Sequence, residues 1–527
     1  MSELDWTIIA VYLLGLIGMS VLLGRGQKTE EDYYVGGRDL PWWAVGISTM
    51  ATQTSVISFI SIPAFVALKD GGGLTWLQYE LAVPLAMIFI MVLLIPFFRK
   101  LELISVYEYL EMRFSRGVRK FVSAVFLLSR GLGTGAGVYA SALVIQVATG
   151  LELYIVIALV GIITIIYDTI GGMKAVVWSD VVQMGVLLVG LVLCIIYALD
   201  LAGGWDAATS SLSPERWTAL NSSLGFDGEP GFWPFLLGGF FLYASYYGTD
   251  QSQTQRELSA PTLADTKRSL VFNGLARFPL TLLYLALGVA LAAALVNMPD
   301  LARMLDESGK PDNLVPLFIV HKLPGGMRAL LIAAMLAAAM SSLDSALNSL
   351  SAATMRDFVH GDRDIPSRTV LIWSKVTTIA WGILITVFAF FVKDIGGTVI
   401  EQINSIGSAF YGPILAAFVL GVLSTRVNAT GILVGVVAGV GINLFLWSQT
   451  DVHFMWWNLT GFAVAVALAF LGSAAGPRPR SDTIARYTLT GAGMWAHERE
   501  WLRTYGALVV YFGLIVGVGF LLNGLAP

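Results

Sequence analysis

The sequence predicts an all-α, polytopic membrane protein, and two observations carry this prediction. Of the 527 residues, 56% are hydrophobic and only 13% are charged, whereas a soluble globular chain has about 45–50% apolar and about 25% charged residues. Apolar stretches of about 20 residues, the length that crosses a bilayer as a helix, also recur along the whole chain. The composition therefore excludes an ordinary soluble enzyme and a disordered chain.

Charge and cysteine content narrow the function further. The net charge of −4 is too small to recruit a partner by bulk charge, and we expect no nucleic-acid partner. The single cysteine, Cys194, excludes a disulfide framework, and the four histidines lack the spacing of metal ligands. The glycine-rich run at 131–137 follows no predicted strand, so it does not indicate a dinucleotide site. We therefore expect neither an enzyme nor an organic cofactor.

The apolar stretches define about fourteen transmembrane helices. The predicted spans are 5–24, 42–68, 74–98, 118–149, 151–168, 174–199, 231–248, 268–296, 326–357, 369–393, 396–423, 428–449, 453–472 and 504–524. Two longer loops, 200–230 and 473–503, have room for short surface helices.

The distribution of basic residues predicts the orientation. When loops are assigned to alternating sides, one side holds twenty-two lysines and arginines, Arg256 among them, and the other side holds seven. Because basic residues gather in cytoplasmic loops, the richer side is predicted to be cytoplasmic. Both termini would then lie on the extracytoplasmic side of a plasma or inner membrane.

Only seven charged residues lie five or more positions inside the ends of the predicted spans. They are Glu80, Arg130, Asp180, Arg277, Asp344, Lys375 and Glu401. Charge within a membrane is costly and usually faces a cavity or a partner. Lys375 and Glu401 lie near span ends, where a side chain can reach the interface. The other five are candidates for function.

The ninth span carries a polar stripe. Ser341, Asp344, Ser345 and Asn348 follow an i, i+3, i+4, i+7 spacing, which places them on one helix face, with Ser342 beside them. Hydroxyl and carboxylate oxygens at this depth are hard ligands that suit a small alkali cation. The alternative is close helix packing, which also uses serine and alanine but does not require an aspartate.

The second span could supply the remaining ligands. Its middle, residues 51–58, is rich in threonine and serine, and Pro63 follows. A helix broken at this depth would free carbonyl oxygens, and such breaks are tolerated where they line a cavity. From the sequence pattern, an intact helix is equally compatible.

Five motifs resemble the sodium:solute symporter family and occur in that family's order. They are GGRDLPWWAVG (36–46), SVYEYLEMRF (105–114), GGMKAVVWSD (171–180), GTDQSQTQRELSA (248–260) and MSSLDSALNS (340–349). The resemblance implies a sodium-coupled secondary transporter. The alternatives from another functional class are a non-transporting sensor and a channel. A channel would need a repeated filter loop, which the sequence does not contain.

The resemblance also implies a LeuT-type five-plus-five inverted repeat with binding sites where the repeats meet. On this basis we divide the chain into four parts: an extra helix and loop (1–41), the first repeat (42–200), the second repeat with an outer loop (201–427) and three peripheral helices (428–527). The expected partners are a small solute, sodium and the lipid bilayer. The oligomeric state stays open.

The family pattern implies two sodium sites. The common site would use the carbonyls of Ala51, Thr54 and Ala338 and the hydroxyls of Ser341 and Ser342. A second site would use Asp180, Ser345 and Asp344, although several family members have a hydroxyl where this chain has Asp344. Two carboxylates strengthen cation binding, or one of them holds a proton. Our hypothesis is two sodium ions per transport cycle.

For the solute, the resemblance to sugar carriers implies Glu80, Arg277, Gln53 and Asn404 as contacts. Tyr79 and Tyr246 match the outer and inner aromatic gates, and Tyr246 would also touch the solute. Ser58 departs from the sugar carriers, which place a larger polar side chain there. The main interpretation is a sugar or polyol, because Glu80 would repel an anion.

The alternative solute is a carboxylate of the monocarboxylate, vitamin or sialic acid type. GGMKAVVWSD looks closer to the monocarboxylate, iodide and vitamin branch than to the glucose branch. Arg130 lies near mid-depth, where a sialic acid carrier uses an arginine to hold the carboxylate. Arginine at position 277 also suits a carboxylate, because its planar fork binds two oxygens. An ion pair between Arg277 and Glu80 is equally compatible with the sequence.

Overall fold

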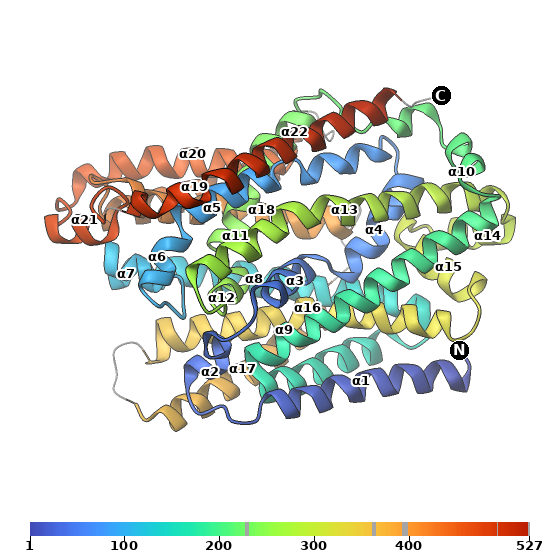
Figure 1. Ribbon diagram of the computed structural model, residues 1–527, viewed down its shortest axis with the longest axis horizontal. Helices are drawn as coiled ribbons and strands as arrows, with labels where there is room; N and C mark the ends of the chain where they lie inside the picture. Colours follow the sequence, from blue (N-terminus) through green and yellow to red (C-terminus); the bar gives the residue numbers. More distant parts are fainter. Residues whose placement is uncertain (227–230, 361–364, 393–398, 493, 525–527) are drawn as a thin grey trace.

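The structure is a computed structural model that describes residues 1–226, 231–360, 365–392, 399–492 and 494–524. All regular secondary structure in these residues is helical (Figure 1). The longer helices are α1 (Glu3–Leu23), α3 (Trp42–Gln53), α4 (Val56–Ala67), α5 (Val83–Leu93), α8 (Arg116–Thr149), α9 (Leu153–Ala202), α11 (Gly239–Gly248), α13 (Leu263–Val296), α16 (Met327–Thr354), α17 (Ser367–Phe391), α18 (Val399–Leu423), α19 (Ala429–Gln449), α20 (Met455–Gly472) and α22 (Leu502–Gly524). The shorter ones are α2 (Glu30–Tyr34), α6 (Ile95–Lys100), α7 (Glu108–Arg113), α10 (Trp205–Ser211), α12 (Gln251–Glu257), α14 (Pro299–Ser308), α15 (Leu314–Lys322) and α21 (Ser481–Tyr487).

Within the described residues, eleven helical segments are long and apolar enough to cross a membrane, or twelve when α3 and α4 count as one bent span. The predicted class, an all-α membrane protein, is confirmed, but the prediction of fourteen spans exceeds this count. The excess has two sources: α9 holds two predicted spans, and the span at 231–248 is divided between η4 (Pro234–Gly238) and α11. The facing ends of the predicted spans 369–393 and 396–423 lie partly outside the described residues.

Helix α9 contains 50 residues and would be about 75 Å long if straight, far more than the roughly 30 Å of a hydrocarbon core. Its geometry is interrupted at Gly172, which has φ 55° and ψ −157°. These angles are essentially restricted to glycine, and a Cβ there would lie 2.7 Å from the carbonyl oxygen of Tyr33. The interruption divides α9 into two arms that correspond to the predicted spans 151–168 and 174–199.

The predicted break in the second span is present. Helix α3 ends at Gln53, α4 begins at Val56, and the two are bent by 58°. Thr54 and Ser55 leave helical geometry, with ψ angles of 78° and 169°, so the carbonyls at the end of α3 lose the partners that a continuing helix supplies. Pro63 lies inside α4 rather than at the break.

A second break separates α11 from α12. Asp250 has extended backbone angles, and its side chain accepts a hydrogen bond from the backbone N–H of Ser252 at 2.8 Å, which caps α12. Every residue of α12 is buried. The prediction that Arg256 lies in a cytoplasmic loop is therefore wrong. A segment without an apolar stretch resembles a loop in sequence, but here its polar groups are satisfied inside the bundle.

Helix α16 is almost entirely enclosed and packs against α1, α8, α9 and α17. Figure 1 shows α1 at one edge of the bundle and α19, α20 and α22 at the opposite edge. The N-terminal end of α1 and the C-terminal end of α22 lie at the same end of the bundle (Figure 1). This arrangement requires an even number of crossings, while the side of the membrane on which these ends lie stays a prediction.

Candidate functional site

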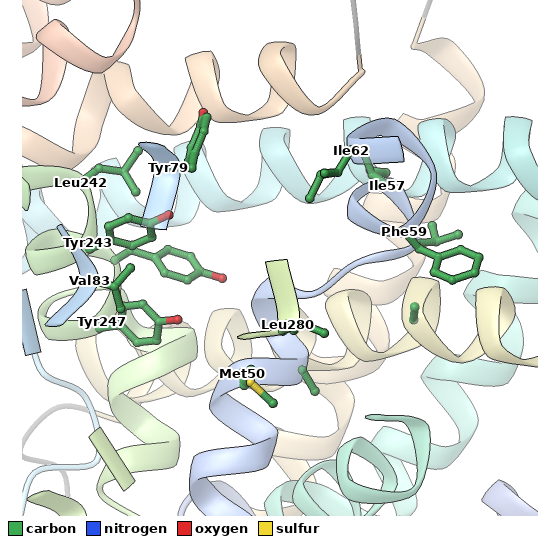
Figure 2. Close-up of a cluster of buried hydrophobic side chains, with 14 of the residues drawn as sticks. Met50, Ile57, Phe59, Ile62, Tyr79, Val83, Leu242, Tyr243, Tyr247 and Leu280 are labelled. Atoms are coloured by element: carbon green, nitrogen blue, oxygen red, sulfur yellow. The ribbon is translucent and has the colours of Figure 1, made fainter. Parts of the chain in front are cut away.

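A cavity of about 190 Å³ lies beside the break between α3 and α4, and its wall also includes residues of η2 (Leu74–Glu80), α8, α11, α13, α16 and α18. Figure 2 shows the extended connection between the helices that carry Met50 and Ile57, with Tyr79, Tyr243 and Tyr247 grouped to one side of it. The cavity brings together every side chain predicted to touch the solute. These are Gln53, Ser58, Glu80, Arg130, Tyr246, Arg277 and Asn404.

Arg277 and Glu80 form an ion pair inside this cavity. The Nη2 atom of Arg277 lies 2.8 Å from Oε1 of Glu80, and its Nε lies 3.3 Å from Oε2. Thr281 donates a further hydrogen bond to Glu80 at 3.0 Å, and Nη1 of Arg277 lies 3.4 Å from the hydroxyl of Thr54. The pair is therefore electrically balanced and ties α13 to η2 (Leu74–Glu80) and to the end of α3.

Arg130 is the other cation of the cavity, and its surroundings differ. Its closest carboxylate belongs to Asp250, with Nη1 and Oδ2 3.6 Å apart. Asp250 already accepts two hydrogen bonds from Ser252 on its other oxygen. The guanidinium also lies over the ring of Tyr246, 5.9 Å from the centroid. The Nε of Arg130 is buried and has no hydrogen-bond partner among the residues that the structure describes.

The two predicted gate tyrosines lie against other aromatic rings. Tyr79 stacks on Trp76 at a centroid distance of 4.5 Å and meets Phe235 at 4.6 Å. The side-chain amide of Asn404 donates to its hydroxyl at 3.3 Å. Tyr246 meets the edges of two further rings, those of Tyr247 and Tyr411. Tyr247 donates in turn to the side-chain oxygen of Gln53. Gln53 and Asn404, both predicted to touch the solute, are thus hydrogen-bonded to tyrosines of this group.

The residues of the predicted common sodium site lie on two adjacent segments. Ala51 and Thr54 stand at the end of α3, and Ala338, Ser341 and Ser342 occupy one turn of α16. Ser342 and Thr54 both line the cavity, and the hydroxyl of Ser342 lies 3.4 Å from the carbonyl oxygen of Ala338. The hydroxyl of Ser341 points elsewhere and donates to Asp180.

Next to the cavity lies a second polar cluster, which we call the Asp180 group and define as Asp180, Ser48, Ser341 and Ser345. Asp180 accepts hydrogen bonds from Ser341 on Oδ1 and from Ser48 on Oδ2, the latter at 2.5 Å. Ser345 joins the group through Arg256, which donates to its hydroxyl. The structure thus gathers two of the three residues predicted for a second sodium site, Asp180 and Ser345.

The third predicted residue, Asp344, borders the Asp180 group. Its Oδ1 accepts a hydrogen bond from Ser345 at 3.1 Å, and its Oδ2 accepts one from the hydroxyl of Tyr167 on α9. Asp344 and Tyr167 are fully buried. Asp344 therefore faces hydroxyl donors on both sides, a setting that suits a carboxylate beside a cation.

Sequence reasoning missed four buried polar residues near these sites: Tyr167, Asp168, Asp250 and Arg256. Asp168 lies on α9, where Asn348 reaches it at 3.5 Å. Asp250 and Arg256 belong to the motif at 248–260, which suggested a loop because it contains no apolar stretch. The isolated Asp168 within IIYDTI was the one sequence signal that could have been used.

The two charged residues expected at span ends have partners in the structure. Lys69 at the end of α4 forms an ion pair with Glu401 of α18. Lys375 lies over the ring of Tyr33, 5.4 Å from its centroid, and its Nζ is 3.4 Å from the carbonyl oxygen of Ile170. Neither Glu401 nor Lys375 lines the cavity beside the break.

Comparisons with known proteins agree on one family. The model of the sodium:solute symporter family matches residues 33–439. The sodium/sialic acid symporter NanT of Aliivibrio fischeri is 30% identical over 483 residues, which cover 89% of this chain and 93% of that protein. The sodium-coupled monocarboxylate transporter 1 of Xenopus laevis is 29% identical over 461 residues, covering 85% of this chain and 72% of its own.

A solved structure shows the same architecture. The substrate-bound, outward-open state of a Na⁺-coupled sialic acid symporter superimposes with a TM-score of 0.82 at 27% identity. The match covers 91% of this chain and 99% of that one.

Proposed function

The chain belongs to the sodium:solute symporter family, and we propose that it carries a carboxylate-bearing solute across the membrane together with sodium. Family membership makes it a sodium-coupled solute symporter of a membrane and not an enzyme. The solute class, the direction of transport and the sodium ligands are our proposal.

One observation favours a carboxylate over a sugar. The carboxylate of Glu80 is balanced by Arg277 at 2.8 Å, so its charge no longer repels an anion, which was the reason to prefer a sugar or polyol. Arg130 lines the same cavity, and within the described part of the chain its Nε has no hydrogen-bond partner. A guanidinium forms strong bidentate hydrogen bonds with the two oxygens of a carboxylate. The named relatives, which carry sialic acid and monocarboxylates, support the same class.

The remaining cavity residues complete a polar site around this anchor. The amides of Gln53 and Asn404 and the hydroxyl of Ser58 line the same space and can hydrogen-bond hydroxyl or carbonyl groups of the solute. Tyr79 and Tyr246 would close over it from opposite sides. Such a site suits a small carboxylate that carries further polar groups.

Sodium would bind directly beside the solute. In this proposal, the carbonyls of Ala51, Thr54 and Ala338 and the hydroxyls of Ser341 and Ser342 coordinate the ion. Support comes from the break at Thr54, which frees carbonyl groups, and from Ser342, which faces the cavity on the neighbouring helix. The ion would therefore bridge α3 and α16.

This bridge explains the coupling. Sodium binds first and holds α3 against α16, the solute then docks against both proposed repeats (42–200 and 201–427), and the gates close. When the repeats rock toward the cytoplasm, α3 separates from α16 and sodium leaves. Each sodium that crosses with the membrane potential contributes about 2.3 kcal/mol per 100 mV, and a monovalent anion that moves with it costs the same amount. Two sodium ions per anion would therefore leave a net charge of +1 for the potential to drive, in addition to the sodium gradient.

A thermal-shift panel on the purified protein tests the solute class. We expect a sialic acid or a monocarboxylate to raise the melting temperature in sodium buffer but not in potassium buffer, because sodium completes the site. Glucose and a polyol serve as the sugar arm of the panel. Sodium-dependent stabilisation by glucose without any effect of a carboxylate would refute the proposed solute.

A further inference from the structure

We propose that the guanidinium of Arg256 is a tethered cation that competes with sodium for the Asp180 group. The inference rests on the sodium coupling of the proposed function and on the second sodium site, which the family resemblance implies at Asp180. It assigns to Arg256 a role in ion release that is separate from solute binding. Arg256 does not line the solute cavity.

The contacts of Arg256 place its charge where a second sodium ion would sit. Its Nε donates to the hydroxyl of Ser48 at 2.8 Å, and its Nη2 donates to Ser345 and lies 3.5 Å from Oδ2 of Asp180. The side chain is fully buried. These contacts join four segments of the bundle, since the residues come from α3, α9, α12 and α16.

The oxygens of the Asp180 group are all engaged in this arrangement. Ser341 and Ser48 donate to the two oxygens of Asp180, and Ser345 is held by Arg256. A sodium ion on Asp180 would need the lone pairs of these hydroxyls turned toward it. It would also lie against the guanidinium, whose Nη2 is 3.5 Å from Oδ2 of Asp180, and two positive charges in close contact repel each other strongly. Sodium can therefore occupy the group only when Arg256 withdraws.

The exchange has a physical advantage for a transporter. A buried carboxylate without a counter-charge is strongly destabilising, so a sodium site built on Asp180 alone would resist losing its ion. Arg256 replaces the departing sodium and keeps Asp180 compensated. The neighbouring carboxylate of Asp344, 3.1 Å from the hydroxyl of Ser345, keeps the surroundings attractive for the next ion. Arg256 thus lowers sodium affinity and promotes release.

The test compares two buried arginine–aspartate pairs. Arg256→Gln removes the proposed competitor, and Arg119→Gln is the matched control. Arg119 is also buried and pairs with Asp357 at 2.7 Å, but neither of these residues belongs to a proposed sodium site. Sodium binding to the purified full-length protein is measured by thermal shift over a sodium titration at constant ionic strength, and transport is measured in proteoliposomes.

We expect Arg256→Gln to lower the sodium half-saturation about tenfold, the size of effect that one nearby like charge has on an ionic equilibrium. Its maximal transport rate should fall, because sodium leaves more slowly. Arg119→Gln should keep the wild-type sodium half-saturation. An unchanged or raised half-saturation in Arg256→Gln would overturn the inference and leave Arg256 a structural role only.

A second variant keeps the test decisive if the glutamine variant does not fold. Arg256→Lys retains a positive charge for Asp180 but cannot reproduce the fork between Ser48 and Ser345, so it should compete less well and also lower the half-saturation. An unchanged value would again refute the role. Failure of the proposed solute is distinguishable, because it would appear in the solute panel, whereas this test compares only the sodium titrations of the wild-type and variant proteins.

Discussion

Arg277 holds Glu80 by two hydrogen bonds, 2.8 Å and 3.3 Å long, although the two residues are 197 positions apart in the chain. Both side chains are buried in the wall of the solute cavity. The pair neutralises the one carboxylate that had favoured a sugar, and Arg130 is therefore the residue that we propose as the anion anchor.

Glu80→Gln tests the role of this pair. Breaking a buried ion pair costs about 3–5 kcal/mol, so the melting temperature should fall clearly. The double variant Glu80→Gln/Arg277→Gln should recover part of the loss, because no unpaired charge remains. In uptake assays on folded protein, the KM for the carboxylate should stay the same or fall, since Arg277 is freed. A large rise in KM for the Glu80→Gln protein would instead mark Glu80 as a solute contact.

Arg130→Ala should weaken the binding of the carboxylate solute. Hydrogen bonds to charged groups contribute about 1.5–3 kcal/mol, which corresponds to a roughly 10- to 150-fold rise in KM. Arg130→Lys keeps the charge but loses the planar fork, so its KM should lie between those of Arg130→Ala and wild type. Arg116→Ala, an exposed position on the same helix, is the control and should behave as wild type. Equal KM values in all four proteins would contradict the assignment of Arg130.

Ser342→Ala should weaken sodium binding more than solute binding. It removes a hydroxyl at the junction of α3 and α16, and a contact of about 1.5–3 kcal/mol to a charged group predicts at least a tenfold higher sodium half-saturation. Ser349→Ala removes a buried hydroxyl of the same helix that donates to the carbonyl of Ala346 at 2.9 Å, and it should leave sodium dependence unchanged. If the two variants gave the same sodium curve, the common site would be misplaced.

Gly172→Ala should destabilise the fold. A side chain at φ 55° and ψ −157° costs about 1–3 kcal/mol in backbone strain, and its Cβ would also meet the carbonyl of Tyr33 at 2.7 Å. Gly185→Ala is the control on the same helix, because its Cβ would have no neighbour within 4 Å. Melting temperatures in detergent should fall for the first variant only; an equal response would show that the break in α9 tolerates any residue.

Local patterns in the sequence were enough to predict part of the candidate site. The stripe from Ser341 to Asn348 follows helical spacing, so its common face could be predicted from the order of residues alone. Threonine and serine in the second span indicated a break, which the structure places at Thr54 and Ser55.

The predictions that failed depend on contacts between distant segments. Arg256 resembled a loop residue because its own segment is polar, yet it is buried by Ser48 and Ser345, which lie 208 and 89 positions away. Composition along one segment cannot show that other helices satisfy its polar groups. For the same reason, the sequence left open whether Arg277 pairs with Glu80, and only the packing of α13 against η2 decides it.

The most direct test of the central claim is sodium-driven uptake into proteoliposomes that contain the wild-type protein. Labelled sialic acid, a labelled monocarboxylate and labelled glucose are offered separately under an inward sodium gradient. We predict that a carboxylate accumulates, that replacing sodium by potassium abolishes the accumulation, and that Arg130→Ala raises the KM of this uptake. Accumulation of glucose with no uptake of either carboxylate would contradict the proposed function.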